Sequence, residues 1–313
     1  MRSTITELLE LNGKPVFSGH ETFALRYGWM KKVYSALSEI EGTEKTARDV
    51  FNSDDAIAVF GVGKNMVSSM RHWATWTSII DDNGQIDSFA KSVLSDDGLD
   101  PWMESPISLW LLHWQLASKP RLLTYYWFFN YYNGGVFDRE KLKTSIVSMC
   151  EDHSIKAPPL NTIKRDIDCF LGTYVSKPNK KTGVSEDSLE SPLAELNLIT
   201  PVNKRDIFQP RRGSKNSLTI GLFLLVLWDF WNKEWAKQTT LSLEASVYDA
   251  CSPGRIFLLD EDAVLEKAYK LAEMDVGIEW SESSGMRQFQ RTISLDDIKK
   301  TAMKLIEEEY TGA

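Results

Sequence analysis

The sequence predicts a mainly helical α+β protein that contains several winged-helix-like units, each with a small β-hairpin wing. Three observations lead to this fold class. First, two amphipathic segments meet at the glycine-rich turn GVGKN (61–65), and the dipeptide Asn83-Gly84, a strong hairpin signal, follows them. Second, a similar order of helix and hairpin returns within residues 161–215. Third, Ser284-Gly285 marks a further hairpin.

Residues 1–100 are expected to form an N-terminal winged-helix-like DNA-binding domain. Apolar residues recur at helical spacing over 21–41, and the polar pair at 53–54 can cap a short helix that ends at the glycine turn. There Gly61 is expected in the left-handed conformation that lets two helices cross, with Val62 inserted between them. A second helix follows the turn, and the hairpin after it would supply the wing.

Residues 101–235 are expected to form a helical domain that includes the second winged-helix-like unit. A helical segment over 106–133 carries many aromatic side chains, which can build a core or form a surface on which bases stack. Asp138 and Asn161 are positioned to cap two further helices. A basic hairpin over 204–220 and an apolar helix complete the domain.

Residues 236–313 are expected to form a C-terminal α+β segment of the helix-hairpin-helix type. GRIFLL (254–259) has the composition of a strand, and Asp260 can cap the helix that follows it. The hairpin at Ser284-Gly285 leads to an amphipathic helix over 294–310.

Composition restricts the classes of function. The net charge of −8 is unlike that of a small obligate nucleic-acid binder, so any DNA contact must be local. The three cysteines have neither metal-ligand nor disulfide spacing, which is typical of a reducing cytoplasm. The longest apolar run, Ile220–Leu227, is far shorter than the about 20 residues of a membrane span, so no membrane contact is expected.

The glycine turn has two functional interpretations. A phosphate-binding loop needs the pattern G-x-x-x-x-G-K-[ST]. Here Ala58 stands at the position of the first glycine, and Asn65 replaces the hydroxyl residue that would bind magnesium. The segment before the turn also has helical rather than strand character. We therefore expect no nucleotide or organic cofactor.

A helix-turn-helix accounts for more of the pattern. The residues that would point outward from the second helix suit phosphates and base edges of duplex DNA. They are Lys64, Asn65, Ser68, Arg71 and His72. Because many winged helices bind only protein, a protein contact is the alternative.

Two further groups of basic residues favour contact with the DNA backbone. Lys164 and Arg165 lie on the helix expected over 161–175. The basic hairpin can act as a wing that binds phosphates, which would make binding sensitive to salt; a solvated loop is the alternative. Its cations are Lys204, Arg205, Arg211, Arg212 and Lys215.

Three strings in the first part of the chain carry a family resemblance. They are FSGHETFALRYGWMKK (17–32), DAIAVFGVGKNMVSSMRHW (55–73) and LWLLHW (109–114). Together they resemble the SspB family, whose N-terminal signature is F-S-G-H-E-T-F-x-L-R-Y-G-W. SspB proteins belong to bacterial DNA phosphorothioation systems, which place sulfur in the DNA backbone as a mark used in anti-phage defence.

The resemblance implies a DNA-nicking subunit, an endonuclease that opens one strand so that sulfur can be inserted. The chain shows no cysteine desulfurase or ATP-pyrophosphatase motif, so sulfur-transfer (ATP-pyrophosphatase-like) and ATPase subunits of the same system are the expected partners. The alternative is a non-enzymatic winged-helix adaptor that binds DNA and recruits those partners. The family description favours the nickase, whereas the absence of a standard nuclease motif favours the adaptor.

Strand cleavage commonly uses carboxylates that hold Mg²⁺. Asp96, Asp97 and Asp100 surround a glycine and can converge on such a cation. The alternative is a solvated loop whose aspartates cap the following helix.

The GHET string supplies the candidate catalytic residues. His20 and Glu21 can perform acid-base chemistry, and Arg26, expected one turn into the first helix, can bind a phosphate. The alternative is a buried polar network that fixes the start of that helix. His113 lies in an apolar segment and is expected to be a satisfied core residue.

Overall fold

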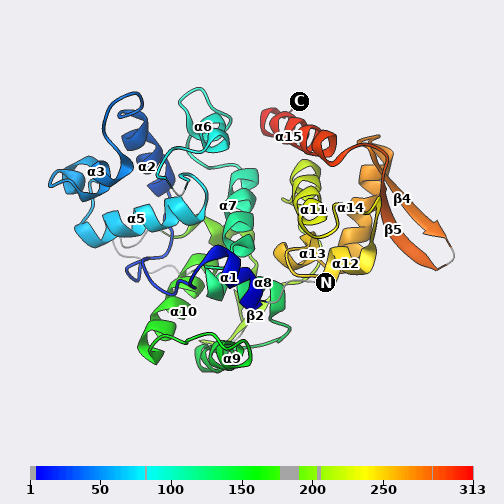
Figure 1. The fold of residues 1–313 in the computed structure, drawn as a ribbon, viewed down its shortest axis with the longest axis horizontal. Coiled ribbons are helices and arrows are strands. Elements are labelled where there is room, and N and C mark those ends of the chain that lie inside the picture. Colours follow the sequence, from blue (N-terminus) through cyan, green and yellow to red (C-terminus); the bar gives the residue numbers. More distant parts are fainter. Residues whose placement is uncertain (1–4, 82, 177–189, 203–205, 284, 313) are drawn as a thin grey trace.

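The computed structural model describes residues 5–81, 83–176, 190–202, 206–283 and 285–312, and it shows a mainly helical protein with small antiparallel sheets (Figure 1). In Figure 1 the blue-to-cyan helices of residues 29–94 lie to one side, the yellow-to-red elements lie to the other, and the dark blue helix of residues 5–12 lies near the middle. No helix in these ranges is both long and apolar enough to span a membrane.

The N-terminal part contains the expected helix-turn-helix corner. Gly61 adopts the left-handed conformation (φ 67°) at the end of the first helix, and Val62 is buried against the core. The helix that ends at Gly61 has its N-cap at Asp55 and not at 53 or 54 as predicted. The helices here are α1 (Ile5–Asn12), α2 (Trp29–Ser38), α3 (Ala47–Asn52), α4 (Ala56–Phe60), α5 (Lys64–Trp76) and α6 (Ser88–Leu94).

The helix expected over 21–41 is shorter than its apolar spacing indicates. It begins only at Trp29, because Glu21, Thr22 and Gly28 all have positive φ, which breaks a right-handed helix. The GHET string therefore forms a turn and an extended segment that lead into α2.

The predicted wing after α5 is reduced. Gly84 has the positive φ (79°) that its turn needs, but the flanking residues form only one isolated bridge, between Ile80 and Ile86. The third predicted hairpin is confirmed, because β4 (Ile278–Ser283) pairs antiparallel with β5 (Met286–Arg291). The description of these elements as winged-helix units stays a prediction.

The aromatic segment expected over 106–133 forms two helices that are broken near Pro120. These are α7 (Pro106–Ser118) and α8 (Leu123–Tyr131). Almost every side chain of α8 is buried, so these rings build a core and not a continuous stacking surface. Tyr131 is only partly buried and lies at the edge of this core.

The next elements are α9 (Arg139–Asp152), α10 (Leu160–Tyr174), a short 3-10 helix η2 (Pro192–Leu196), β1 (Ile199–Pro201) and β2 (Phe208–Pro210). Asp138 caps α9 as predicted, accepting a hydrogen bond from the backbone of Lys141. The cap predicted at Asn161 is wrong, because α10 begins earlier, after Pro159. The basic hairpin pairs Thr200 with Gln209, so its strands start before the predicted range.

The C-terminal part wraps an apolar helix. Its elements are α11 (Ile220–Glu234), β3 (Thr240–Ser242), α12 (Leu243–Tyr248), α13 (Pro253–Ile256), α14 (Glu261–Glu273), β4, β5 and α15 (Leu295–Thr311), with strand order β3-β5-β4.

A strand predicted over 254–259 is wrong. Ser252 accepts a hydrogen bond from the backbone of Arg255, and Pro253 occupies the first position of α13, which starts a helix instead. Gly221 lets α15 lie close against α11, since a Cβ there would sit 2.9 Å from the backbone nitrogen of Ile306.

Buried apolar side chains from Ile5 to Ile306 form one connected core that joins all of these elements. The predicted division at residues 1–100, 101–235 and 236–313 stays a prediction.

Candidate functional site

The exposed face of α5 is the first candidate surface. Lys64, Asn65, Ser68 and Arg71 are all exposed, as the sequence predicts, while Val67 on the opposite side is fully packed. The side chains point outward because the corner at Gly61 turns the apolar stripe of α5 towards α2. The guanidinium of Arg71 lies 5.9 Å from the ring centre of Phe51.

This polar face continues to the end of α5. Lys64, Ser68, Arg71 and Thr75 follow helical spacing and lie on one side of the helix. The hydroxyl of Thr75 donates to the carbonyl of Arg71 over 3.0 Å. An additional cation that sequence reasoning missed, Lys32, is exposed on α2 and donates to the carbonyl of Phe60 beside the corner.

The outward orientation predicted for His72 is wrong. Its ring packs edge-on against His20 and Trp73, with centre distances of 5.7 Å and 5.2 Å. Burial, and secondarily the neighbouring charge of His20, lower the pKa of His72 from 6.5 to about 3. The imidazole is therefore neutral at pH 7 and adds no positive charge to the exposed face.

The GHET turn forms the buried polar network that was the alternative to catalysis. The Nδ1 atom of His20 accepts from the backbone of Thr22 over 3.0 Å, so its proton is assigned to Nε2, which donates to Asp166 over 3.2 Å. The second carboxylate oxygen of Asp166 accepts from the hydroxyl of Thr124. Both nitrogens of His20 are thus engaged, whereas Glu21 is exposed.

Arg26 does not lie in a helix as predicted but in the segment before α2. Its guanidinium lies between two rings, 5.2 Å from the centre of Phe23 and 5.3 Å from that of Trp29. It also contacts the sulfur of Met66 on α5 at 3.8 Å. The structure thus buries His20 and Arg26 in separate surroundings, and a catalytic role for these residues with Glu21 stays a prediction.

The three predicted metal ligands have different surroundings. Asp100, 8% exposed, accepts from the backbone nitrogens of Glu104 and Ser105 and from the hydroxyl of Ser108, and so holds the segment that leads into α7, whose N-cap is Ser105. Asp97 is exposed.

The exposed carboxylate of Asp96 pairs with the buried ammonium of Lys31 over 2.8 Å. Within the described ranges, no group of three or more His, Cys, Asp or Glu side chains is placed to hold a metal ion. Asp96 and Asp100 thus have partners within the protein, and a Mg²⁺ site at these acids stays a prediction.

The predicted basic residues differ in exposure and in their hydrogen-bond partners. Lys164, Arg165 and Arg211 are exposed, whereas Lys204 and Arg205 fall outside the described residues.

Lys215 links two backbone segments through hydrogen bonds. Its ammonium donates to the carbonyls of Gly213, Arg211 and Leu258 over 2.8–3.2 Å. Burial, and then the charge of Arg211, lower its pKa to about 8. Arg212 is exposed and donates to the carbonyl of Tyr132 over 3.4 Å.

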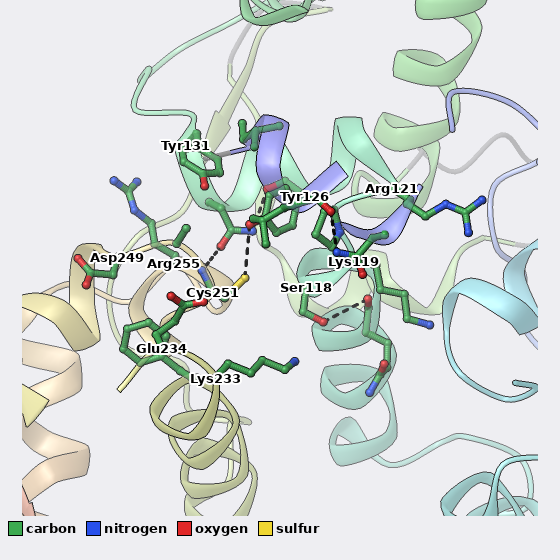
Figure 2. A pocket seen from close by; sticks show the side chains of 18 of the residues that line it. Ser118, Lys119, Arg121, Tyr126, Tyr131, Lys233, Glu234, Asp249, Cys251 and Arg255 are labelled. Carbon is green, nitrogen blue, oxygen red and sulfur yellow. Dashed lines mark hydrogen bonds between the residues drawn. The ribbon is translucent and has the colours of Figure 1, made fainter. Parts of the chain in front are cut away.

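This central cleft has a volume of about 850 Å³ (Figure 2). Its walls come from α1, the ends of α5, α7, α8, α11 and α12, and the segment that leads into α13. Figure 2 shows Arg255, Lys233 and Arg121 around the cleft, each on a different segment of the chain. Sequence reasoning missed the cleft because its residues are far apart in the chain.

Charge in the central cleft is mixed but mainly positive. The cations are Lys119, Arg121, Lys233 and Arg255, and the acids are Glu234 and Asp249.

Fold and site together define a helical protein in which one helix, α5, follows a helix-turn-helix corner at its start and lines a large cleft at its end. The chain belongs to the family described as "Protein of unknown function (DUF4007)", whose sequence profile matches residues 17–310. It is also similar to two solved structures of SspB. One, the magnesium ion-bound SspB crystal structure, is 27% identical with a TM-score of 0.82, and the match covers 99% of this chain and 91% of that chain.

The second, an SspB crystal structure, is 27% identical with a TM-score of 0.78 over 94% of this chain and 87% of that chain. A comparison with curated proteins finds no match. The chain is therefore SspB-like over its length, which confirms the resemblance predicted from its sequence.

Proposed function

We propose that this protein is the DNA-binding subunit of a DNA phosphorothioation system and that it binds duplex DNA through the exposed face of α5. One observation carries the proposal. Lys64, Asn65, Ser68 and Arg71 are all exposed on one helix that follows a helix-turn-helix corner. The likeness to SspB supports the system to which the protein is assigned.

The geometry of α5 suits a groove or the strand that borders it. Lys64 and Arg71 are seven positions apart, which on a helix corresponds to about 10 Å along the axis. They can bind phosphates, while Asn65 and Ser68 can reach base edges. Because the whole chain carries a net charge of −8, this local cationic face must overcome a general repulsion.

Salt titration tests this proposal. Fluorescence anisotropy of a labelled duplex should show affinity that falls steeply with salt. Arg71→Gln and Lys64→Gln should each reduce the slope of log K against log salt by about 0.9. At about 0.1 M salt, each loss corresponds to roughly tenfold weaker binding.

Arg287→Gln is the matched control, because Arg287 is exposed on β5 and pairs with Glu261. The proposal is wrong if the two α5 variants bind DNA with the affinity and salt slope of the unaltered protein.

Nicking of one strand is the second candidate function. It is favoured by the magnesium-bound state of an SspB relative. Supercoiled plasmid should relax to the open circle when the protein and Mg²⁺ are present and should stay supercoiled with chelator. Asp97→Ala and Glu21→Gln remove exposed predicted groups without disturbing the core. Full relaxation by the double variant would exclude both side chains from cleavage.

The adaptor alternative makes a different prediction in the same assay. The purified chain would bind the plasmid with a steep salt dependence but would not relax it at any Mg²⁺ concentration. Adding the sulfur-transfer and ATPase partner subunits would then be required for strand opening.

A further inference from the structure

The central cleft is large enough for a ligand and has a positively charged edge. Its volume of about 850 Å³ falls in the range of small-molecule sites. At one edge, Arg255 donates to the carbonyl of Tyr248 over 3.0 Å and to the amide oxygen of Asn133 over 2.7 Å. Arg212 donates to the carbonyl of Tyr132, the residue next to Asn133. Two guanidinium groups are therefore held against the same short segment.

The pairing of these two arginines favours a bound anion. Among the described residues, their hydrogen-bond partners are backbone and amide oxygens and not carboxylates. Burial, and then the charge of Arg212, lower the pKa of Arg255, which reflects two like charges in a half-buried place. Phosphate oxygens bridging both guanidiniums would relieve this repulsion and form charge-assisted hydrogen bonds.

Aromatic side chains stand beside this edge. Tyr248 is 52% exposed, and Tyr131 and Trp235 are half-buried in the cleft wall. An exposed ring next to paired arginines is the combination by which proteins bind unpaired nucleotides, because every base offers a flat face for stacking.

The remaining charges of the cleft have partners within the protein. Lys119 donates to the carbonyl of Thr75 at the end of α5, and Lys233 pairs with Asp229 over 2.8 Å. Asp249 acts electrostatically on Arg255, and Glu234 and several helix C-terminal ends add negative potential to the cleft. A phosphate is thus favoured only where the two charges of Arg212 and Arg255 together exceed that of Asp249.

The cleft also continues the exposed face of α5. Thr75, which shares the stripe of Lys64 and Arg71, lines the cleft, and so does the next residue, Trp76. A strand whose phosphates follow this stripe is led directly to the mouth of the cleft.

From these observations, we infer that the central cleft binds a nucleoside phosphate unit of an unpaired DNA segment, with its phosphate on Arg212 and Arg255 and its base against the ring of Tyr248. The path of the strand rests on the proposed function of α5, whereas the ligand chemistry of the cleft does not.

The test compares a blunt duplex with the same duplex carrying a short single-stranded overhang, by fluorescence anisotropy. The intact protein should bind the overhang substrate more tightly, by about 5- to 100-fold for stacking and phosphate contact. Tyr248→Ala and Arg255→Gln should remove this preference and leave blunt-duplex affinity unchanged. Tyr269→Ala, at another exposed tyrosine (45%), should change neither.

The variants distinguish the two proposals. Arg71→Gln should weaken the binding of both substrates equally. If it changes neither affinity while Tyr248→Ala still removes the preference for the overhang, the function proposed for α5 fails and the cleft assignment stands. Deoxyadenosine monophosphate distinguishes the sources of the ligand. If the mononucleotide binds tightly and Tyr248→Ala abolishes that binding, the occupant is a free nucleotide. If the mononucleotide does not compete with the overhang substrate, the occupant is the strand.

The inference is overturned if neither substrate preference nor mononucleotide binding changes in Tyr248→Ala. Because Tyr248 is half exposed, its replacement leaves the core intact. The result therefore holds even if Arg255→Gln, which removes two structural hydrogen bonds, proves unstable.

Discussion

Acid should destabilise this protein through His113, the fully buried imidazole of α7. Its Nε2 atom donates to the carbonyl of Ile256 over 2.7 Å, and its Nδ1 atom lies 2.9 Å from the hydroxyl of Tyr174, which then donates to it. Burial is the main cause that lowers the pKa of His113 from 6.5 to about 4. The folded protein thus holds this histidine neutral and disfavours its protonation.

The magnitude follows from proton linkage. In the unfolded chain the imidazole takes up a proton below about pH 6.5, whereas in the folded chain it does so only near pH 4. Its contribution to stability is therefore present above pH 6.5 and is lost as the pH falls from 6.5 to about 4. The full loss amounts to about 3 kcal/mol, because one pKa unit corresponds to about 1.36 kcal/mol.

His113→Gln isolates this contribution, because glutamine keeps a donor and an acceptor but does not titrate. Urea unfolding at several pH values would measure the free energies of unfolding of both proteins. At pH 7 the variant should be less stable by about 1–3 kcal/mol. This difference in unfolding free energy should narrow by about 2 kcal/mol as the pH approaches 4.5. Because His72 titrates in both proteins, its contribution cancels from the difference. A gap that stays constant between pH 7 and pH 4.5 would refute the reasoning.

The other predictions concern a glycine, an aspartate and a cysteine. Gly19→Ala should lower the melting temperature more than Gly42→Ala, because both have positive φ but only at Gly19 would a Cβ lie 2.8 Å from a histidine ring; equal losses would contradict this. Asp100→Ala should cost about 2–4 kcal/mol in urea unfolding and Asp97→Ala about 0.5 kcal/mol or less, since Asp100 is buried and accepts three hydrogen bonds whereas Asp97 is exposed. Burial raises the pKa of Cys251 to about 11, so iodoacetamide at pH 8 should modify it roughly 100-fold more slowly than in the denatured chain.

Features that depend on neighbouring residues could be predicted from the sequence. The left-handed Gly61, the buried Val62 and the exposed polar face of α5 all follow from a local turn and a helical period. The cap at Asp138 and the C-terminal hairpin were predicted for the same reason.

Features that depend on residues far apart in the chain could not be predicted from the sequence. The sequence around His20 allowed both catalysis and a buried network, and its burial beside Asp166, far along the chain, is seen only in the structure. Similarly, the sequence offered Asp100 as a carboxylate for metal, and only the structure shows that it accepts hydrogen bonds from Glu104, Ser105 and Ser108. The central cleft gave no sequence signal, because no single segment supplies more than a few of its walls.

One helix, α10, connects both candidate surfaces. On the side of α5, the ring of His72 packs on His20, and His20 donates to Asp166 of α10. The hydroxyl of Thr124 on α8 holds the other oxygen of that carboxylate. His20 thus links α5 to α10, through a ring contact on one side and a hydrogen bond on the other.

At the other end of α10, Tyr174 bonds to His113, and His113 donates to the carbonyl of Ile256 in α13. The residue before Ile256 is Arg255, whose guanidinium lies at the cleft edge. Buried hydrogen bonds of this kind are costly to break, because each lost partner leaves a desolvated polar group. If both proposals hold, these contacts would keep the exposed face of α5 and Arg255 in a fixed relation, and a strand bound to one surface would meet the other in a constant register.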